Sequence, residues 1–249
     1  MKKFLVSTAA MGAMLASATT ASAAEFGGVS VSASVDYVSE YVFRGVSFAN
    51  TSIQPGVELG FGGFSAGVWS SSAIGSNSAL AGDEIDLYAG YGWNLTEKLS
   101  ASVGATIFHF PGADGLFSFD SDTLGSTLEV YGGVAYDTLL APSFNLYYDF
   151  TLDAFTLEGS LSHSFPVAEK TSFDLGVTGG HVTVNNAGNY EWATGSASLG
   201  YALTDSTSFY VGANYTLNSE DLLDFPTAGD PILDNDNLFW VGTGFSTGF

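Results

Sequence analysis

Alternation between apolar and polar residues, sustained over almost the whole chain, is the feature that most restricts its fold. In EIDLYAGYGW (residues 84–93), one parity collects Ile85, Leu87, Ala89, Tyr91 and Trp93, and the other collects acids, tyrosine and glycine. Successive side chains of a β-strand point to opposite faces, so the pattern predicts a strand with one apolar face. SFYVGANYTL and FTLEGSLSHSF repeat it.

An even number of such segments, about 12, is expected along the chain. They lie near residues 29–43, 53–62, 64–70, 84–93, 99–109, 127–136, 143–150, 154–165, 172–182, 191–203, 208–217 and 238–249. Short linkers alternate with long polar ones, which are residues 71–83, 110–126 and 218–237. This predicts an all-β protein, a closed antiparallel transmembrane β-barrel of about 12 strands with short periplasmic turns and longer extracellular loops.

Aromatic residues recur at one height on the apolar faces. At the short-turn end, the predicted girdle is formed by Phe61, Phe64, Trp93, Tyr136, Phe144, Phe165, Phe173, Tyr201, Phe209 and Phe249. A second, less complete belt is expected at the long-loop end, formed by Tyr41, Phe43, Tyr148, Phe155, Tyr215 and Phe239. Aromatic girdles mark both lipid interfaces of membrane barrels. A soluble β-sandwich also alternates, but nothing in its packing places rings at one height.

The first 24 residues are expected to be a secretory signal peptide, followed by the barrel domain at residues 25–249. A basic start precedes an apolar run at residues 4–18, and ASAAE offers cleavage after residue 23 or 24. The chain has no cysteine, so disulfides play no part. No later stretch approaches 18 consecutive apolar residues, which excludes a helical membrane protein.

The charge balance excludes one class of partner. The chain carries 26 acids against five basic residues, two of which lie in the leader. Nucleic-acid binding depends on neutralising phosphates with Lys and Arg, so nucleic acid is not expected as a partner. A hydrophobic content of 46% and an aromatic content of 14% also argue against disorder.

The polar faces predict an acidic lumen. Parity assigns to it Asp36, Glu40, Glu58, Glu84, Asp86, Glu129, Asp149, Glu158, Asp174 and Glu191, with Arg44 as the one lumenal cation. A water-filled lumen of this kind favours cations over anions. The alternative is a nearly closed barrel in which these carboxylates are protonated or hydrogen-bonded, because unpaired buried charge is costly.

Arg44 is the only arginine of the chain. If the expected strand at residues 29–43 continues to residue 44, the side chain of Arg44 points into the lumen, as do those of Asp36 and Glu40. A hairpin with the next strand places Glu58 on a near diagonal, and barrel closure brings Trp240, a lumen aromatic, within stacking range. We therefore expect Arg44 to be the hub of an acid cluster near the outer mouth, as a structural clamp or as a solute filter.

Catalytic and metal motifs are weak. Residues 63–67 match the G-x-S-x-G pattern at Ser65, but no helix follows as a hydrolase elbow requires. His109, His163 and His181 share the lipid-facing parity, and no serine is placed beside them for proton transfer. No enzyme is expected, and an outer-face lipid hydrolase ranks third among the functions.

No metal site and no cofactor are predicted from the sequence. Cysteine is absent, and no histidine pair has metal-ligand spacing. The acidic segment 218–237 offers oxygen ligands for calcium but lacks the spacing of an EF-hand, and acidic loops are commonly just solvated.

DYVSEYVFRGVSF at the start of the expected barrel, with its Tyr-Val-Phe-Arg-Gly core at residues 41–45, resembles the TorF-like family of outer-membrane porins. PGVELGF, FSAGVWSS, EIDLYAGYGW and, more loosely, TLEVYGG extend the resemblance. The final strand, ending in Phe249, looks like the aromatic signature read by the barrel assembly machinery. The resemblance implies a Gram-negative outer-membrane location and a pore, without naming a substrate.

The expected function is passive diffusion of small solutes, with a cation preference, through a barrel that one chain closes by itself and that contacts outer-membrane lipid. The main alternative is a plugged barrel with a structural or surface-interaction role. Twelve strands leave a narrower opening than 16 to 18 strands do, and inward-folded loops narrow it further.

Overall fold

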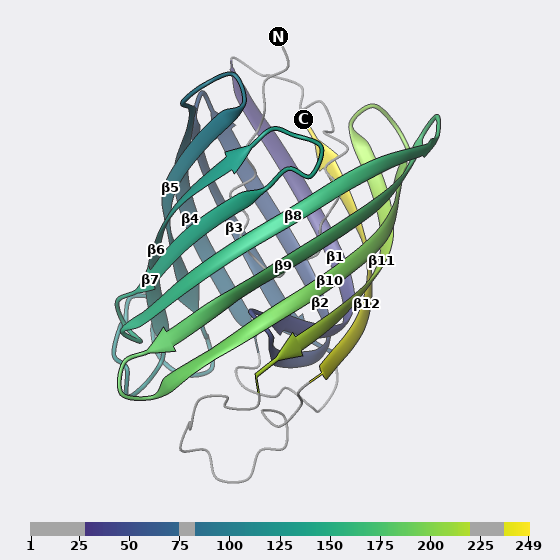
Figure 1. Cartoon of the computed structure of the whole chain (residues 1–249). Helices are drawn as coiled ribbons and strands as arrows, with labels where there is room; N and C mark the ends of the chain where they lie inside the picture. The colour runs from purple at the N-terminus through teal and green to yellow at the C-terminus, as the bar shows by residue number, and fades with distance from the viewer. Residues whose placement is uncertain (1–27, 75–82, 220–236) are drawn as a thin grey trace.

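The chain forms a closed barrel of twelve antiparallel strands, which confirms the predicted fold class (Figure 1). The computed structural model describes residues 28–74, 83–219 and 237–249. Each strand pairs with its neighbours in sequence, and β1 pairs with β12 to close the sheet. The expected signal peptide and most of the acidic segment 218–237 lie outside the described residues.

The strand bounds follow the expected segments, with β2 as the main exception. They are β1 Val29–Phe43, β2 Val46–Phe61, β3 Phe64–Ala73, β4 Glu84–Asn94, β5 Leu99–His109, β6 Ser126–Tyr136, β7 Ser143–Asp149, β8 Ala154–Ala168, β9 Thr171–Val184, β10 Gly188–Ala202, β11 Thr207–Asn218 and β12 Asn237–Gly248. Within the described ranges, no helix is long and apolar enough to cross a membrane.

The β1–β2 connection differs from the expectation that β2 begins at residue 53. Only Arg44 and Gly45 separate the strands, and both have positive φ, at 47° and 85°. Two-residue hairpins of type I′ need positive φ at both positions, which glycine adopts freely. Residues 46–52 therefore extend β2 instead of forming a loop.

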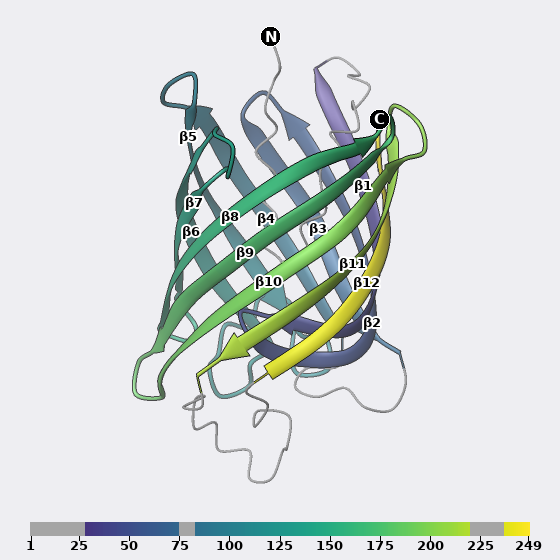
Figure 2. The same cartoon turned by 45° about the vertical axis from the view of Figure 1, so that its right-hand side comes forward.

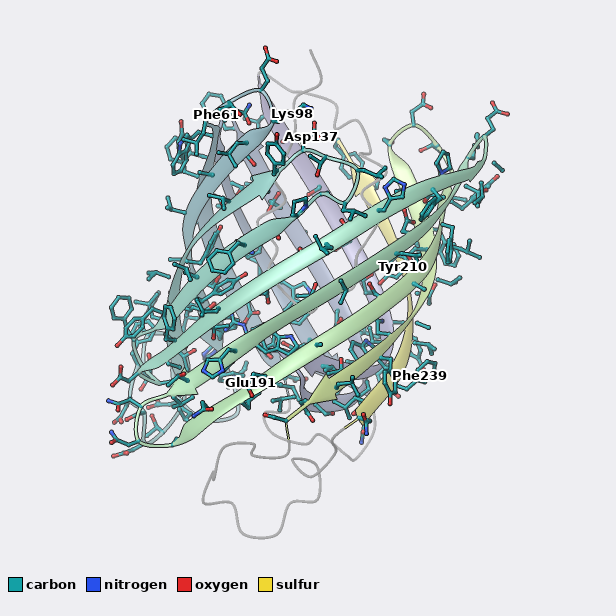
Figure 3. The ribbon with its side chains drawn as sticks, in the orientation of Figure 1. Phe61, Lys98, Asp137, Glu191, Tyr210 and Phe239 are labelled. Carbon is teal, nitrogen blue, oxygen red and sulfur yellow. The ribbon has the colours of Figure 1, made fainter. Side chains whose placement is uncertain are left out.

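The two ends of the barrel carry different connections. The start of β1 and the end of β12 lie at the same end of the barrel as five short turns, which are residues 62–63, 95–98, 137–142, 169–170 and 203–206. The longer connections between β3 and β4, β5 and β6, and β11 and β12 belong to the other end. Figure 3 marks Lys98 and Asp137 at the short-turn end. At the opposite end, however, residues 150–153 and 185–187 are also short, so only some outer connections are long.

The outward face is apolar and aromatic. The predicted girdle residues at the short-turn end all lie on this face, with Phe61 61%, Phe64 64% and Phe249 57% exposed. At the other end Tyr148, Phe155, Tyr215 and Phe239 also face outward, and Figure 3 shows Phe61 and Phe239 at opposite ends of the wall. Inward-facing positions are instead buried or half-buried.

Candidate functional site: the lumen and the hairpin tip

The end of the β1–β2 hairpin leaves the barrel wall. Pairing of β1 with β12 ends at Val38, and pairing of β2 with β3 ends at Ser52. Residues 40–50, here called the hairpin tip, pair only with each other. A register shift between Tyr41 and Val42 marks an irregularity of the kind that bends a strand. In Figure 2 the dark hairpin end curls across the loop-side end of the barrel.

One side of the hairpin tip packs against the inner faces of β9 to β12. Val42 joins a buried cluster with Leu238 and Trp240 of β12, and Val46 packs against Val182 of β9 and Trp192 of β10. The side-chain amide of Asn218 on β11 donates to the carbonyl of Gly45 at 2.7 Å. These contacts attach the tip to one half of the wall.

The other side of the hairpin tip reaches the opposite half of the wall. Tyr41 lies 5.5 Å from the ring of Trp69 on β3, and its hydroxyl hydrogen-bonds to Glu84 on β4. Phe43 lies 5.8 Å from the ring of Phe108 on β5. The assignment of Tyr41 and Phe43 to the outer lipid belt was therefore wrong. Because the tip lies inside the barrel, both of its faces contact the lumen wall.

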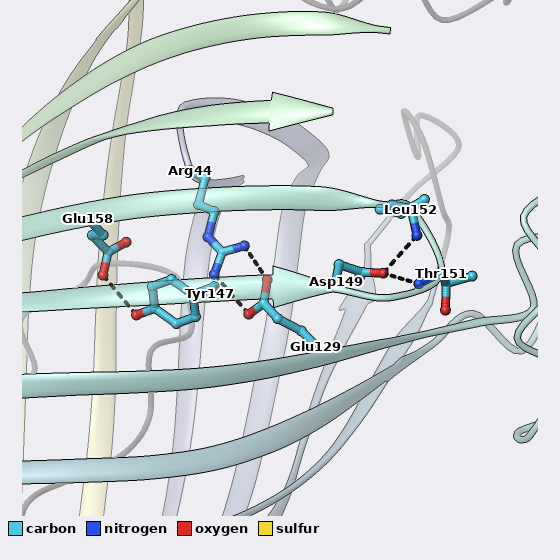
Figure 4. A network of polar contacts seen from close by, with 7 residues as sticks. All are labelled: Arg44, Glu129, Tyr147, Asp149, Thr151, Leu152 and Glu158. Atoms are coloured by element: carbon cyan, nitrogen blue, oxygen red, sulfur yellow. Dashed lines mark hydrogen bonds and ion pairs between the residues drawn. The ribbon is translucent and has the colours of Figure 1, made fainter. Parts of the chain in front are cut away.

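Arg44, at the turn of the hairpin tip, forms a bidentate ion pair with Glu129 on β6 (Figure 4). The two N···O distances are 2.6 and 2.9 Å, and the side chains are 10% and 6% exposed. The guanidinium also lies 4.3 Å from the ring centre of Tyr147 on β7. Tyr147 in turn donates to Glu158 at 3.0 Å. Arg44 thus sits among acids near the outer mouth.

The partners of Arg44 differ from those expected. Glu58 pairs in register with Ser32 and Gly67, near the short-turn end, because β2 is longer than predicted. Trp240 packs with Val42, while the rings stacked on the guanidinium belong to Phe43 and Tyr147. The predicted contacts of Arg44 with Glu58 and Trp240 were wrong, because the tip turns inward instead of continuing along the wall.

Several of the remaining predicted lumen acids are held by local donors. Tyr210 donates to Asp36 at 2.7 Å, Tyr88 hydrogen-bonds to Glu58, and Ser172 donates to Asp174 at 2.8 Å. Asp149 accepts from the backbone N–H groups of Thr151 and Leu152 and so caps the β7–β8 turn (Figure 4). Glu40 lies on the hairpin tip opposite Asn50.

Glu84 and Asp86 lie side by side on the inner face of β4, behind the hairpin tip. Their side chains are 3% and 0% exposed. The two carboxyl groups hydrogen-bond to each other, and no other described group donates to either oxygen of Asp86 or to Oε2 of Glu84. Two carboxyl groups in contact inside a protein favour sharing one proton over carrying two charges. This pair therefore belongs to the packed part of the lumen rather than to its open part.

Glu191 was predicted to face the lumen, and the structure corrects this assignment. Its side chain is 62% exposed and its Oε1 lies 2.9 Å from Nδ1 of His181 on the outer face. Glu191 has the same parity as Tyr201, whereas Trp192 occupies the inward position. The sequence signal was available, because β10 alternates without interruption from Tyr190 to Tyr201.

Several lumen rings lie flat against the wall instead of crossing it. Each stands directly opposite a glycine on the neighbouring strand: the pairs are Tyr88 with Gly67, Tyr131 with Gly104, Trp192 with Gly180, and Tyr210 with Gly244. A Cβ built on any of these glycines would collide with the opposing ring. The glycines thus make room for rings along the wall, which sequence reasoning did not foresee.

The remaining candidate catalytic and metal-binding residues do not lie together. Ser65 lies on the inner face of β3, whereas His109, His163 and His181 lie on outward faces of three strands. In the described parts of the chain, no three acidic or histidine side chains are grouped as metal ligands. The proposed calcium segment at 218–237 falls almost wholly outside these parts.

Solved structures of outer-membrane channels share this architecture. The KdgM porin in complex with disordered oligogalacturonate superimposes with a TM-score of 0.56 at 11% identity, covering 88% of this chain and 99% of that chain. The NanC porin gives 0.52 at 13% identity, covering 87% and 98%. An outer membrane channel from Pseudomonas putida F1 gives 0.52 at 12% identity, covering 91% and 97%. At these identities the likeness establishes the shared fold.

Sequence comparison identifies the family. No curated protein matches the chain significantly. A family model described as "Bacterial protein of unknown function (Gcw_chp)" matches residues 21–216, which include all strands from β1 to β10 and most of β11. This chain belongs to the Gcw_chp family.

Proposed function

We propose that this protein is an outer-membrane channel for the passive diffusion of small solutes, with a preference for cations. The observation that carries the proposal is the charge of the lumen wall. Carboxylates line it on most strands, and Arg44, its one cationic side chain among the described residues, is already neutralised by Glu129. A low-dielectric passage with this surplus of negative charge attracts cations and repels anions.

The fold supports a channel function without indicating a solute, because similar barrels include the KdgM and NanC porins. The KdgM structure holds an oligogalacturonate, an anionic sugar chain. The acidic lumen of this chain argues for a different class of solute. The motif at residues 41–45 supports our inference that the Gcw_chp chains and the TorF-like porins are related.

The same reasoning extends to location and biogenesis. Girdles of outward rings at both ends of the wall support residence in a Gram-negative outer membrane. The terminal Phe249 supports delivery by the barrel assembly machinery, and the leader at residues 1–24 supports export. Diffusion needs no cofactor and no covalent chemistry at the lumen wall.

The hairpin tip favours a second candidate function, a plugged barrel with a structural role. Its contacts with β3 to β7 on one side and β9 to β12 on the other leave less room for solute at this level. If the tip closes the lumen fully, the barrel serves as a scaffold for its outer loops.

Planar-bilayer recordings in a salt gradient test both candidates. We expect discrete conductance steps and a reversal potential whose sign shows that cations pass more readily than anions. A reversal potential of the opposite sign would retain the channel and reject the charge argument. The plugged barrel would be supported if the folded wild-type protein gives no conductance steps and a variant with residues 40–50 replaced by a short Asn-Gly turn does give them.

A further inference from the structure

Three side chains on the outer face of β9 and β10 form a continuous hydrogen-bonded chain. His181 Nδ1 lies 2.9 Å from Glu191 Oε1, and His181 Nε2 lies 2.9 Å from Thr183 Oγ1. Glu191 stands directly opposite His181 in the β9–β10 pair, and Thr183 follows two residues along the same face. Glu191 is labelled at this place on the wall in Figure 3.

The chemistry of the three groups fixes the direction of these hydrogen bonds. A carboxylate only accepts, so Nδ1 carries the hydrogen that faces Glu191. In the neutral ring Nε2 is then an acceptor, and the hydroxyl of Thr183 donates to it. An acid that orients a histidine, which in turn accepts from a hydroxyl, is the arrangement that activates an oxygen nucleophile.

The other two histidines lack this arrangement. His109 Nδ1 lies 3.0 Å from Ser126 Oγ, but that hydroxyl donates to the carbonyl of Leu116 and the side chain is fully buried. His163 hydrogen-bonds to the carbonyl of Leu139 and packs edge-on against the ring of Phe165, and neither contact supplies a hydroxyl or an acid. Among the described histidines, only His181 joins a carboxylate to a hydroxyl, and Thr183 beside it is exposed.

The cluster lies at the level of the outer aromatic belt. Phe155 of β8 stands directly opposite Thr183, and Leu157 stands opposite His181. Such rings mark the interface between hydrocarbon and headgroups, where the ester bonds of lipids lie. A charged carboxylate on the outward face is also tolerated at this level, whereas near the bilayer centre it is costly.

A path of small residues leads from the cluster toward the middle of the wall. Below Glu191 the outward positions of β10 are Ala193 and Gly195, which stand opposite Gly179 and the exposed Val177 of β9. No atom lies within 4 Å of a Cβ built on Gly195. The path continues into an apolar groove of about 550 Å³ whose lining includes Ala197, Leu199 and Val211.

The length of this path suits an acyl chain. Six residues separate Glu191 from Ala197, or about 20 Å along a strand. With a strand tilt of roughly 45° this spans about 14 Å of depth, close to the roughly 15 Å of one leaflet. A lipid whose ester lies at Thr183 can therefore place its acyl chain along the path and into the groove.

We propose that Thr183, His181 and Glu191 form a catalytic site that hydrolyses an acyl ester of a membrane lipid. Thr183 Oγ1 attacks the ester carbonyl carbon while its proton moves to His181 Nε2. The tetrahedral intermediate expels the lipid alcohol, which takes that proton, and an acyl-threonine remains. Water then attacks the acyl group with the same histidine as base, releasing the fatty acid and restoring Thr183. Glu191 orients the ring and stabilises its charged form.

Sequence reasoning missed this site for two reasons. It sought serine beside histidine, and it assigned Glu191 to the lumen. The sequence did contain a signal. His181 and Thr183 are two residues apart on one face of a strand, and the short hairpin that follows brings Glu191 of the next strand opposite His181. The inference depends on the proposed outer-membrane location but not on an open lumen.

The test measures fatty-acid release by the purified, folded protein in mixed detergent micelles. Phosphatidylethanolamine is the probe in one arm and lipopolysaccharide in the other, which distinguishes the two sources of the ester. We expect release in at least one arm, a loss of about 10³-fold or more in Thr183→Ala and His181→Ala, and a loss of roughly 10²- to 10⁴-fold in Glu191→Gln. Thr183→Ser retains activity, because it keeps the hydroxyl.

His163→Ala is the matched control, since it removes an outward histidine that lacks the hydroxyl and the acid. A shift on heated gels verifies that every variant is folded, and bilayer conductance is expected to be the same in Thr183→Ala as in wild type. Absence of fatty-acid release by folded wild-type protein in both arms would overturn the proposal. Fatty-acid release that persists in Thr183→Ala would also overturn the proposal. Neither result would affect the channel proposal, which conductance tests separately.

Discussion

Arg44 and Glu129 meet in a bidentate ion pair although 85 residues separate them in the chain. The pair joins the turn of the inward-folded hairpin tip to the inner face of β6. Both side chains are nearly buried, so the pair holds the tip against a wall with which it shares no backbone pairing. The position of the tip, and with it the width of the lumen at this level, depends on this contact.

Replacing Arg44 by Ala is expected to destabilise the folded barrel by about 3–5 kcal/mol, because it leaves Glu129 buried without a counter-charge. The measurement is the temperature at which the folded band disappears on a gel. The double variant Arg44→Met/Glu129→Leu removes both charges and is expected to recover much of the loss. Equal stability of Arg44→Ala and wild type, with altered ion selectivity, would instead assign Arg44 to solute contact.

A Cβ at position 45 is expected to displace the hairpin tip. Gly45 has a φ of 85°, and a Cβ there would lie 2.5 Å from the Cβ of Trp192. Gly45→Val should therefore loosen the tip and increase single-channel conductance relative to wild type. Gly62→Val, at another turn with positive φ but with open space around it, is the matched control for backbone strain alone. Unchanged conductance in Gly45→Val alongside a normal folded band would contradict this prediction.

Neutralising lumen carboxylates is expected to reduce cation preference. Asp36 and Glu58 lie away from the hairpin tip on β1 and β2, so Asp36→Asn/Glu58→Gln removes negative charge with little change in side-chain volume. The reversal potential in a salt gradient should move toward the value for no selectivity. The matched control is Glu191→Gln, whose side chain lies outside the barrel and should leave the reversal potential unchanged.

Replacing Gly104 is expected to narrow the lumen. A Cβ there would collide with the ring of Tyr131 on the neighbouring strand. Gly104→Ala should push this ring away from the wall, lower the conductance and destabilise the barrel by about 1–3 kcal/mol. Combining it with Tyr131→Ala relieves the collision. If that double variant does not recover conductance, the ring does not set the width at this level.

The turn at residues 150–153 contains a carboxyl group with an altered pKa. Tyr148 donates to Asp153 Oδ1 at 2.5 Å and Asn185 donates to Oδ2 at 2.6 Å, which lowers the pKa of Asp153 below its usual 3.8. A lowered folded-state pKa stabilises the fold above the unfolded-state pKa, and this stabilisation is lost as pH falls through the folded value.

Asp153→Asn is therefore expected to lower stability at pH 7, with the difference from wild type shrinking as the pH falls below about 3.8. Asparagine tolerates the positive φ of 49° at this position, so the substitution isolates the charge. Carboxyl chemical shifts followed against pH would check the prediction. A titration midpoint at or above 3.8 would contradict it.

Alternation determined most of the strands, and together with the linker lengths and the outward rings it determined the barrel. EIDLYAGYGW and its counterparts place apolar side chains on one face of each strand, and an all-antiparallel order follows from the short turns between them. The outward rings at the short-turn end were also readable, because residues such as Phe61 and Phe64 flank a recognisable turn. These features depend on local periodicity, which one sequence carries in full.

Only the tertiary structure decided what the hairpin tip and the outer face of β9 do. Parity distinguishes the two faces of a strand, but it assumes that the strand stays in the wall. Tyr41 and Phe43 turn inward because residues 40–50 leave the wall, and no local pattern shows which distant strands they then meet. The pairing of Arg44 with Glu129 and of His181 with both Thr183 and Glu191 depends on closure and register, which are set by all twelve strands together.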